Sequence, residues 1–313
     1  MTFRKFVNEV KEGLPDFLPK ELKQAEIKEN TVQKNNGIQL TGISLFEFNK
    51  MSPTIYMEHF YQKYLNGSEM EDILKELSSI YQQNTMVDIP PILKDFSYEN
   101  VKNKIYVSVC NAEKNKELLQ DVPHELREDL ALTYRILMDC PNGNVGSALI
   151  HNSHINSWGI DENMLKEGAW DSTRKLFPDV FKGIVSMIGE MILQLPEEML
   201  GEIPPEDTMY VLTNTKGTYG AAYMFDSEAM ERIAARLGGN LIILPSSLHE
   251  VIILPEKEGM DLQALKDMVS EINRAQLEED EILSDEIYHY DATSHSLHMV
   301  EGLDHSTGIK FSM

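Results

Sequence analysis

The sequence contains few cysteines, few tryptophans and no long apolar segment. Cys110 and Cys140 are the two cysteines among 313 residues, and there are two tryptophans. Two thiols are too few for the disulfide framework of a small secreted domain or for a four-thiolate zinc site. No apolar run approaches the roughly 20 residues that span a bilayer. We therefore expect a protein of the reducing cytoplasm that has no membrane partner.

Basic residues are also scarce. Lysine and arginine together number 28 against 51 aspartates and glutamates, which gives a formal net charge of −23. This balance disfavours direct binding of nucleic acid, which needs a basic surface, and adhesion to anionic membranes. Residues 1–8 (MTFRKFVN) carry a basic pair, but no apolar stretch follows it, so we expect no signal peptide. The charge is instead suited to a basic protein or peptide partner.

The length allows one large domain or two medium ones, each able to bury its own core. The Pro90-Pro91 pair interrupts the chain between two regions of regular patterning. We place a helix-hairpin-helix region at residues 1–95, a main α+β region at 96–301 and a frayed tail at 302–313. A single integrated unit is the alternative, because Pro-Pro pairs also occur within domains.

Turn residues predict two hairpins. Asn36-Gly37 separates the extended segments 24–33 and 38–48, and this pair supplies the positive φ angles of a tight turn. A second hairpin is expected around residues 139–144, between the segments 130–138 and 146–154. Further strands are expected over these apolar stretches: 103–109, 209–213, 220–224, 241–244, 251–254, 287–290 and 296–300.

Apolar residues spaced by three and four predict the helices. Start and stop residues bound them: Gly13 and Pro15 end the first helix, and Ser52-Pro53 opens the next. Asp161, Asp226 or Ser227, and Asp261 are the expected caps of three later helices. Because hairpins and helices alternate without strand-helix-strand units, we predict an α+β fold, with antiparallel sheets built from hairpins and covered on one face by helices.

Four segments of the chain together resemble a known bacterial family. They are Asn111 to Met138 (NAEKNKELLQDVPHELREDLALTYRILM), Ile150 to Ile160 (IHNSHINSWGI), Leu241 to Leu254 (LIILPSSLHEVIIL) and, upstream, Asn35 to Tyr56 (NNGIQLTGISLFEFNKMSPTIY). The family is domain of unknown function 5688. The resemblance extends through nearly the whole chain and implies a free-standing cytoplasmic bacterial protein, but no activity, because the family has none assigned.

Ser246, His249 and Glu250 are the best candidates for a polar functional site. They lie between two expected core strands. A zinc protease would need a second histidine where Ile253 stands, and a serine hydrolase would need a Gly-x-Ser-x-Gly or Ser-x-x-Lys motif, which is absent. Two interpretations stay open: a hydrolase or transferase with an unfamiliar constellation, or a turn whose polar side chains hydrogen-bond its own backbone.

Other polar motifs give weaker indications. His151 and His154 are the candidate metal ligands, but in an extended segment residues three apart point to opposite faces, so we expect no metal. Lys216 precedes Gly217 in the segment 214–220 (NTKGTYG), which is the wrong order for a P-loop, so a hairpin turn is the better explanation. The acidic run 278–286 lacks the pattern of an EF-hand. We expect no cofactor.

The sequence as a whole favours a non-enzymatic protein that binds a basic partner. Complementary charge would raise the rate and specificity of that encounter. The alternative is the hydrolase or transferase around Ser246, His249 and Glu250. A third interpretation is an acidic mimic of nucleic acid, which the charge of −23 permits.

Overall fold

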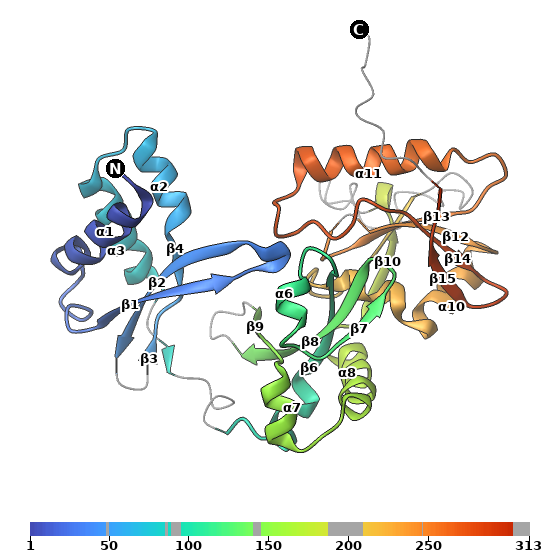
Figure 1. Ribbon diagram of the computed structural model, residues 1–313, viewed down its shortest axis with the longest axis horizontal. Coiled ribbons are helices and arrows are strands. Elements are labelled where there is room, and N and C mark those ends of the chain that lie inside the picture. Colours follow the sequence, from blue (N-terminus) through green and yellow to red (C-terminus); the bar gives the residue numbers. More distant parts are fainter. Residues whose placement is uncertain are drawn as a thin grey trace, which may run out of the picture. The chain divides into compact units, whose positions relative to one another are not determined.

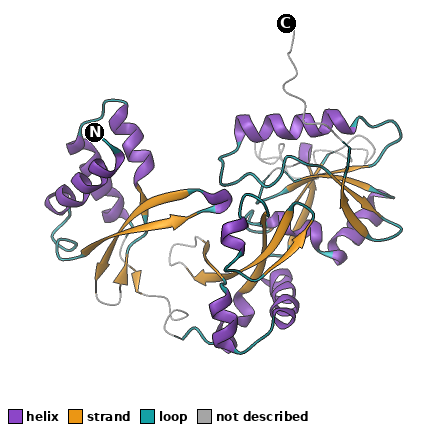
Figure 2. Ribbon diagram, in the orientation of Figure 1, coloured by secondary structure: helices purple, strands orange, loops and turns teal. Residues whose placement is uncertain are grey.

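The computed structural model describes residues 1–47, 50–84, 87–88, 95–139, 145–186, 209–245 and 247–302 (Figures 1 and 2). The chain divides into two compact units. The first is Met1–Phe96 with Asp139–Val145, and the second is Ser97–Met138 with Gly146–Met313. Predictions that concerned Pro90-Pro91, Cys140, Ser246 and the tail after residue 302 lie outside the described residues.

In the first unit, helices pack against a sheet that begins with a long hairpin. Strand order is β1-β2-β3-β5, with β4 also pairing with β2. Phe6, Leu14, Leu45 and Tyr81 belong to its buried core. The elements are α1 (Phe3–Phe17), β1 (Glu26–Gln33), η1 (Asn35–Gly37), β2 (Gln39–Glu47), β3 (Lys50–Met51), β4 (Ile55–Tyr56), α2 (Met57–Leu65), α3 (Met70–Gln83) and β5 (Val87–Asp88).

The predicted Asn-Gly hairpin is confirmed. β1 and β2 pair antiparallel, ending at Gln33 opposite Gln39. Asn36 and Gly37 have φ angles of 58° and 72°. These are the left-handed conformations that asparagine and glycine tolerate best.

Two helix boundaries predicted in this unit were wrong. α1 continues through Pro15 to Phe17, because Leu14 and Leu18 are buried and the Ser78 hydroxyl donates to the Phe17 carbonyl at 2.7 Å. This packing outweighs the single hydrogen bond that proline removes. Ser52 does not open a helix: its hydroxyl accepts the Leu45 N–H at 2.7 Å, and α2 begins only at Met57.

The second unit contains two antiparallel sheets. The strand orders are β6-β8-β7, with β9 also on β8, and β10-β11-β13-β12-β14-β15. The strands are β6 (Ile105–Asn111), β7 (His124–Arg127), β8 (Leu130–Asp139), β9 (Val145–Leu149), β10 (Asp179–Gly183), β11 (Tyr210–Asn214), β12 (Leu241–Leu244), β13 (Val251–Pro255), β14 (Tyr288–Asp291) and β15 (Ser296–Met299). The helices are α5 (Tyr98–Val101), η2 (Lys102–Lys104), α6 (Lys116–Leu119), α7 (Asn152–Trp158), α8 (Glu162–Leu176), η5 (Gly220–Phe225), α10 (Ser227–Leu237) and α11 (Leu262–Gln276).

The α+β fold with antiparallel sheets is confirmed, and the helical cover of the six-stranded sheet extends to both faces. Ile242 and Leu244 pack under α11 with Val269. Leu241 and Ile243 point the other way and are also fully buried. In Figure 1, α10 lies on the side of this sheet opposite α11. An all-apolar strand such as β12 is typical of a sheet buried on both faces.

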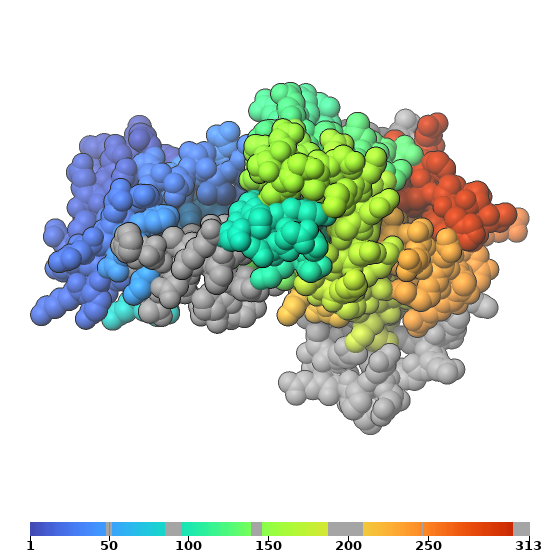
Figure 3. Space-filling view, turned by 90° about the horizontal axis from the view of Figure 1, so that it is seen from below, coloured from blue at the N-terminus to red at the C-terminus, as the bar shows by residue number. Residues whose placement is uncertain are grey.

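The predicted helix caps of the second unit are confirmed. Asp161 accepts the Met164 N–H at 2.8 Å, Asp226 accepts the Ala229 N–H at 3.1 Å, and Asp261 accepts the Ala264 N–H at 3.0 Å. Each side chain satisfies a backbone donor that the first helical turn leaves without a partner. The segment of α5 and η2 packs beside α7 and α8. Figure 3 shows this segment in turquoise next to the yellow-green atoms of those two helices.

Asp129, in the turn between β7 and β8, connects the two sheets. Its carboxylate accepts the Ser284 hydroxyl at 2.6 Å and the Tyr288 hydroxyl. Burial and the neighbouring Asp129 charge raise the pKa of the Tyr288 phenol, so it stays a donor at every ordinary pH. The β7–β8 turn is therefore held to the segment that enters β14.

One predicted strand is a helix instead. Residues 220–224 form part of η5, so the segment 214–220 does not join two strands of a hairpin. Gly220 lies directly against Thr213 and the His249 carbonyl, which leaves no room for a paired strand.

Among the described residues, no helix is both long enough and apolar enough to cross a bilayer.

Candidate functional site

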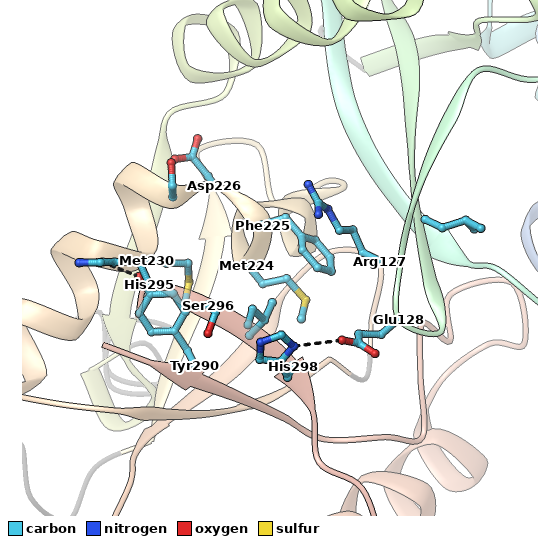
Figure 4. A pocket seen from close by; sticks show the side chains of 13 residues that line it. Arg127, Glu128, Met224, Phe225, Asp226, Met230, Tyr290, His295, Ser296 and His298 are labelled. Carbon is cyan, nitrogen blue, oxygen red and sulfur yellow. Dashed lines mark hydrogen bonds and ion pairs between the residues drawn. The ribbon is translucent and has the colours of Figure 1, made fainter. Parts of the chain in front are cut away.

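A surface groove of the second unit collects residues from three distant parts of the chain (Figure 4). Its larger hollow has a volume of about 540 Å³. Leu126 and Arg127 at the end of β7 and Glu128 in the turn after it form one wall. The floor comes from η5 and α10, and the opposite wall from β14 and β15. In Figure 4 the Glu128 and His298 side chains point toward each other across this hollow.

A second hollow of about 450 Å³ adjoins the first. The two share Arg127 and the 225–227 segment that leads into α10. Lys166, Trp170 and Arg174 extend the wall along α8, and Glu125 adds to it from β7. We call the two hollows together the edge groove.

Two methionines lie at the floor of the edge groove. Met224 and Met230 are each 1% exposed, and their side chains line the larger hollow. Leu126 on the β7 wall is 61% exposed, which makes it one of the most exposed large apolar side chains of the described residues. Unbranched methionines can adjust to ligands of different shape, and an exposed leucine provides an anchor for one.

Acidic side chains outnumber basic ones around the edge groove. Among the described residues that line it, Glu125, Glu128, Glu167, Asp171 and Asp226 face Arg127, Lys166 and Arg174, five carboxylates against three cations. The cations are already paired: Lys166 and Arg127 with Glu125, and Arg174 with Asp226. Glu128 contacts only His298, at 3.3 Å, among its described neighbours. The groove therefore carries net negative charge.

Two strand edges border the groove. β7 and β15 each lie at the end of their sheet. The Val300 N–H donates to the Ile287 carbonyl at 2.9 Å. Because hydrogen-bonded and non-hydrogen-bonded pairs alternate along antiparallel strands, the backbone of Leu297 points away from β14. Leu297 lines the larger hollow, so its N–H and C=O lie at the rim of the groove.

The loop between β12 and β13, here the His249 loop, brings only part of the predicted polar site together. Ser246 lies outside the described residues. The buried Ser247 hydroxyl accepts the His249 backbone N–H at 3.0 Å. His249 Nδ1 accepts the Tyr219 backbone N–H at 3.3 Å, and Nε2 lies 3.7 Å from Glu281 Oε1. The Ser247 and His249 side chains thus bind backbone groups, which supports the turn interpretation. A catalytic role for Ser246, His249 or Glu250 stays a prediction.

Glu250 is held in a partly buried position that disfavours its charge. Burial raises the pKa of this carboxyl above its ordinary value of 4.5, the His249 ring opposes the shift and Glu281 adds to it. A carboxyl with a raised pKa reduces the stability of the fold once it is ionised.

Glu250→Gln is therefore expected to raise the melting temperature at pH 7. The gain should shrink as the pH falls and vanish below pH 4.5, where the carboxyl is protonated in both folded and unfolded chains. Thermal melts across this pH range measure the effect, with Glu271→Gln on the exposed face of α11 as the control. A gain that is the same at every pH would contradict the assignment.

The two candidate metal ligands occupy the start of a helix, not an extended segment. His151 is the N-cap of α7 and His154 lies in its first turn. His154 Nδ1 accepts the His151 backbone N–H at 3.0 Å, and His151 Nδ1 lies 2.8 Å from Asp121 Oδ2. Burial lowers the pKa of His154. These contacts cap the helix, and in the described part of the chain no group of three histidine, cysteine or acidic side chains could hold a metal.

The segment 214–220 closes on itself. The Asn214 side-chain oxygen accepts the Lys216 N–H at 2.9 Å, so this loop uses its own donor and does not form a phosphate cradle.

Cys110 is buried at 7% exposure, and burial raises the pKa of its thiol to about 12. A thiol with so high a pKa is not a nucleophile at neutral pH.

A family model matches nearly the whole chain. The family of unknown function DUF5688 covers residues 3–292. The chain belongs to this family. No curated protein and no solved structure gives a significant match. Membership in DUF5688 confirms the resemblance found in the sequence, and the match includes the edge groove up to β14 together with the whole His249 loop.

Sequence reasoning missed the edge groove of this DUF5688 chain. Leu126, Asp226 and Leu297 come together only when two sheets and two helices assemble, and no local pattern connects them. Glu128 and His295 have positive φ angles of 55° and 54°. Non-glycine residues seldom adopt this conformation, and it cannot be predicted from the sequence at these two positions. The sequence signal that could have been noticed is a single leucine, Leu126, between the charged residues Glu125 and Arg127.

Proposed function

We propose that this protein binds an extended basic segment of another protein in the edge groove. The observation that carries the proposal is the course of the groove along β15 and β7, two strand edges with two methionines at the floor between them. An extended peptide can add to an exposed edge, where main-chain hydrogen bonds give affinity and alternate side chains enter the groove. Leu297 supplies the backbone groups for such pairing.

The charge of the groove selects the kind of peptide. Five carboxylates against three already paired cations favour lysine and arginine side chains in the partner. Glu128 stands at the turn of β7 and its contact with His298 is exposed to solvent, so it can exchange that contact for a cation of the peptide. The overall charge of −23 adds long-range attraction for a basic partner.

Glu128→Lys is expected to weaken binding of a peptide of alternating lysine and leucine by at least about tenfold, because like charges then face each other at the groove wall. Leu126→Ser should weaken it severalfold through loss of the apolar anchor. Fluorescence anisotropy with the labelled peptide measures both affinities in the full chain. Leu126 is largely exposed, so its change should leave the melting temperature almost unaltered.

The matched control is Glu258→Lys, which makes the same charge reversal at an exposed position of the second unit away from the groove. It should bind the peptide nearly as well as the wild type. An equal loss in the control would mean that net charge alone attracts the peptide, and the proposal would fail. A peptide of alternating glutamate and leucine should not bind.

The other two interpretations have less support. A hydrolase or transferase would need a free His249 ring nitrogen as the base, whereas Nδ1 accepts the Tyr219 N–H, which leaves the proton on Nε2, 3.7 Å from Glu281 Oε1. A nucleic-acid mimic would need unneutralised carboxylates in a row, whereas Glu29, Glu125 and Glu76 each pair with a lysine or arginine. We further propose that the protein is cytoplasmic and that its N-terminal region, residues 1–95, folds independently.

A further inference from the structure

Arg135 on β8 differs from the arginines of the edge groove, because no described carboxylate pairs with it. Its Nε donates to the Ser147 hydroxyl at 3.1 Å, and its guanidinium carbon lies 4.8 Å from the centre of the Tyr219 ring. Within the described residues Arg135 makes no ion pair, and the Tyr106 hydroxyl is the other polar group that acts on it. In a chain with nearly twice as many acidic as basic residues, a half-buried guanidinium without a counter-ion is unexpected.

A second polar group, the Tyr106 hydroxyl, lies beside Arg135 and Ser147. Tyr106 lies directly opposite Arg135 on β6 and is only 2% exposed. Its hydroxyl is buried and makes no hydrogen bond of normal geometry within the described part of the chain. A buried hydroxyl without a well-formed hydrogen bond destabilises the fold, and Arg135 and Ser147 are the described polar side chains that act on this one.

The side chains that surround these two donors are held in place. Tyr106, Arg135 and Ser147 lie on the neighbouring strands β6, β8 and β9. Tyr219, the residue before η5, packs against Tyr106 and Arg135: it has a φ angle of 56°, and its backbone N–H donates to His249 Nδ1. Backbone strain of this kind occurs preferentially at binding sites. The rings of Tyr106 and Tyr219 lie 6.1 Å apart.

We propose that Tyr106, Arg135, Ser147 and Tyr219, here the Arg135 cluster, bind an oxyanion, the phosphate or carboxylate group of a small molecule. The guanidinium presents two parallel N–H donors that match such a group, and the phenol and serine hydroxyls add neutral donors. Stacking on Tyr219 fixes the plane of the guanidinium. This site is separate from the peptide proposed for the edge groove, since the two have no residue in common.

The net charge of the protein opposes binding of any anion, which makes the test selective. At physiological ionic strength the field of distant carboxylates is screened beyond about 8 Å, so the local guanidinium dominates. Only a site with directed donors should then retain an anion at constant ionic strength.

Inorganic phosphate and acetate, titrated separately into the full chain at an ionic strength held constant with sodium chloride, test the proposal by calorimetry and thermal melting. At least one of them should bind saturably to the wild type. The stronger one identifies the ligand as phosphate-bearing or carboxylate-bearing. Arg135→Gln should reduce the affinity at least about tenfold, whereas Arg274→Gln, at an exposed position of α11, should leave it unchanged.

Tyr106→Phe keeps the aromatic ring and removes only the hydroxyl. It should weaken anion binding while leaving the free protein equally or more stable, because a buried hydroxyl without a well-formed hydrogen bond is gone. This variant keeps the test decisive if Arg135→Gln fails to fold. The proposal is overturned if neither anion binds the wild type, or if both variants bind as tightly as the wild type.

Discussion

Asp226→Ala is expected to lower the free energy of unfolding by about 3 kcal/mol. Asp226 is 1% exposed in its side chain, caps α10 and pairs with Arg174 at 2.8 Å. Loss of the cap costs about 1 kcal/mol. Loss of a buried ion pair costs more, about 2 kcal/mol here, below the usual range because Arg174 is one-third exposed and keeps Glu228 at 3.3 Å.

Two further variants separate these contributions. Asp226→Asn retains a capping side chain and removes the charge, so it should lose only the ion-pair part. Asp161→Ala removes the exposed cap of α8 and should cost about 1 kcal/mol. Urea unfolding with an unchanged slope measures all three. If Asp226→Ala costs no more than Asp161→Ala, the Arg174 pair contributes nothing to stability.

Gly220→Ala is expected to destabilise the second unit by about 3 kcal/mol or more. A Cβ at this position would lie 2.6 Å from the His249 carbonyl oxygen and 2.8 Å from Thr213 Cα. Both are backbone atoms that cannot rotate away, and the Thr213 hydroxyl already donates to that carbonyl at 2.7 Å. The loop that carries Tyr219 would have to move away from the His249 loop.

Gly239→Ala is the matched control. A Cβ at Gly239 meets nothing within 4 Å, and the residue has no positive φ angle that disfavours alanine. This change should be neutral or stabilise the protein by up to about 1 kcal/mol, because it restricts the unfolded chain. Equal melting temperatures for the two alanine variants would show that the Gly220 contact relaxes without cost.

The features that could be predicted from the sequence have causes within a few residues. Asn36-Gly37 can take positive φ angles, and Asp161, Asp226 and Asp261 each reach the third residue along their own helix. Such local requirements are visible in the order of residues, and the antiparallel hairpin sheets follow from them.

The features that could not be predicted depend on distant residues. Pro15 stays helical because Ser78 of α3, which lies 61 residues after Phe17, donates a hydrogen bond to the Phe17 carbonyl. Residues 220–224 form a helix because Gly220 packs on a loop nearly 30 residues further along. The candidate site has the same character: His249 could be singled out by its position between strands, but its partner is the backbone of Tyr219, which no motif connects to it.

The hydrogen bonds of the Asp129 carboxylate affect how a partner peptide would bind in the edge groove. It binds the segment before β14 and β14 itself while its neighbour Glu128 lines the groove, so the two walls are fastened to each other in the free protein. The width of the groove is then set before any peptide arrives. The conformational entropy that is lost on binding is therefore mostly lost by the peptide. A peptide that is already rigid and extended should bind faster and more tightly than a flexible one.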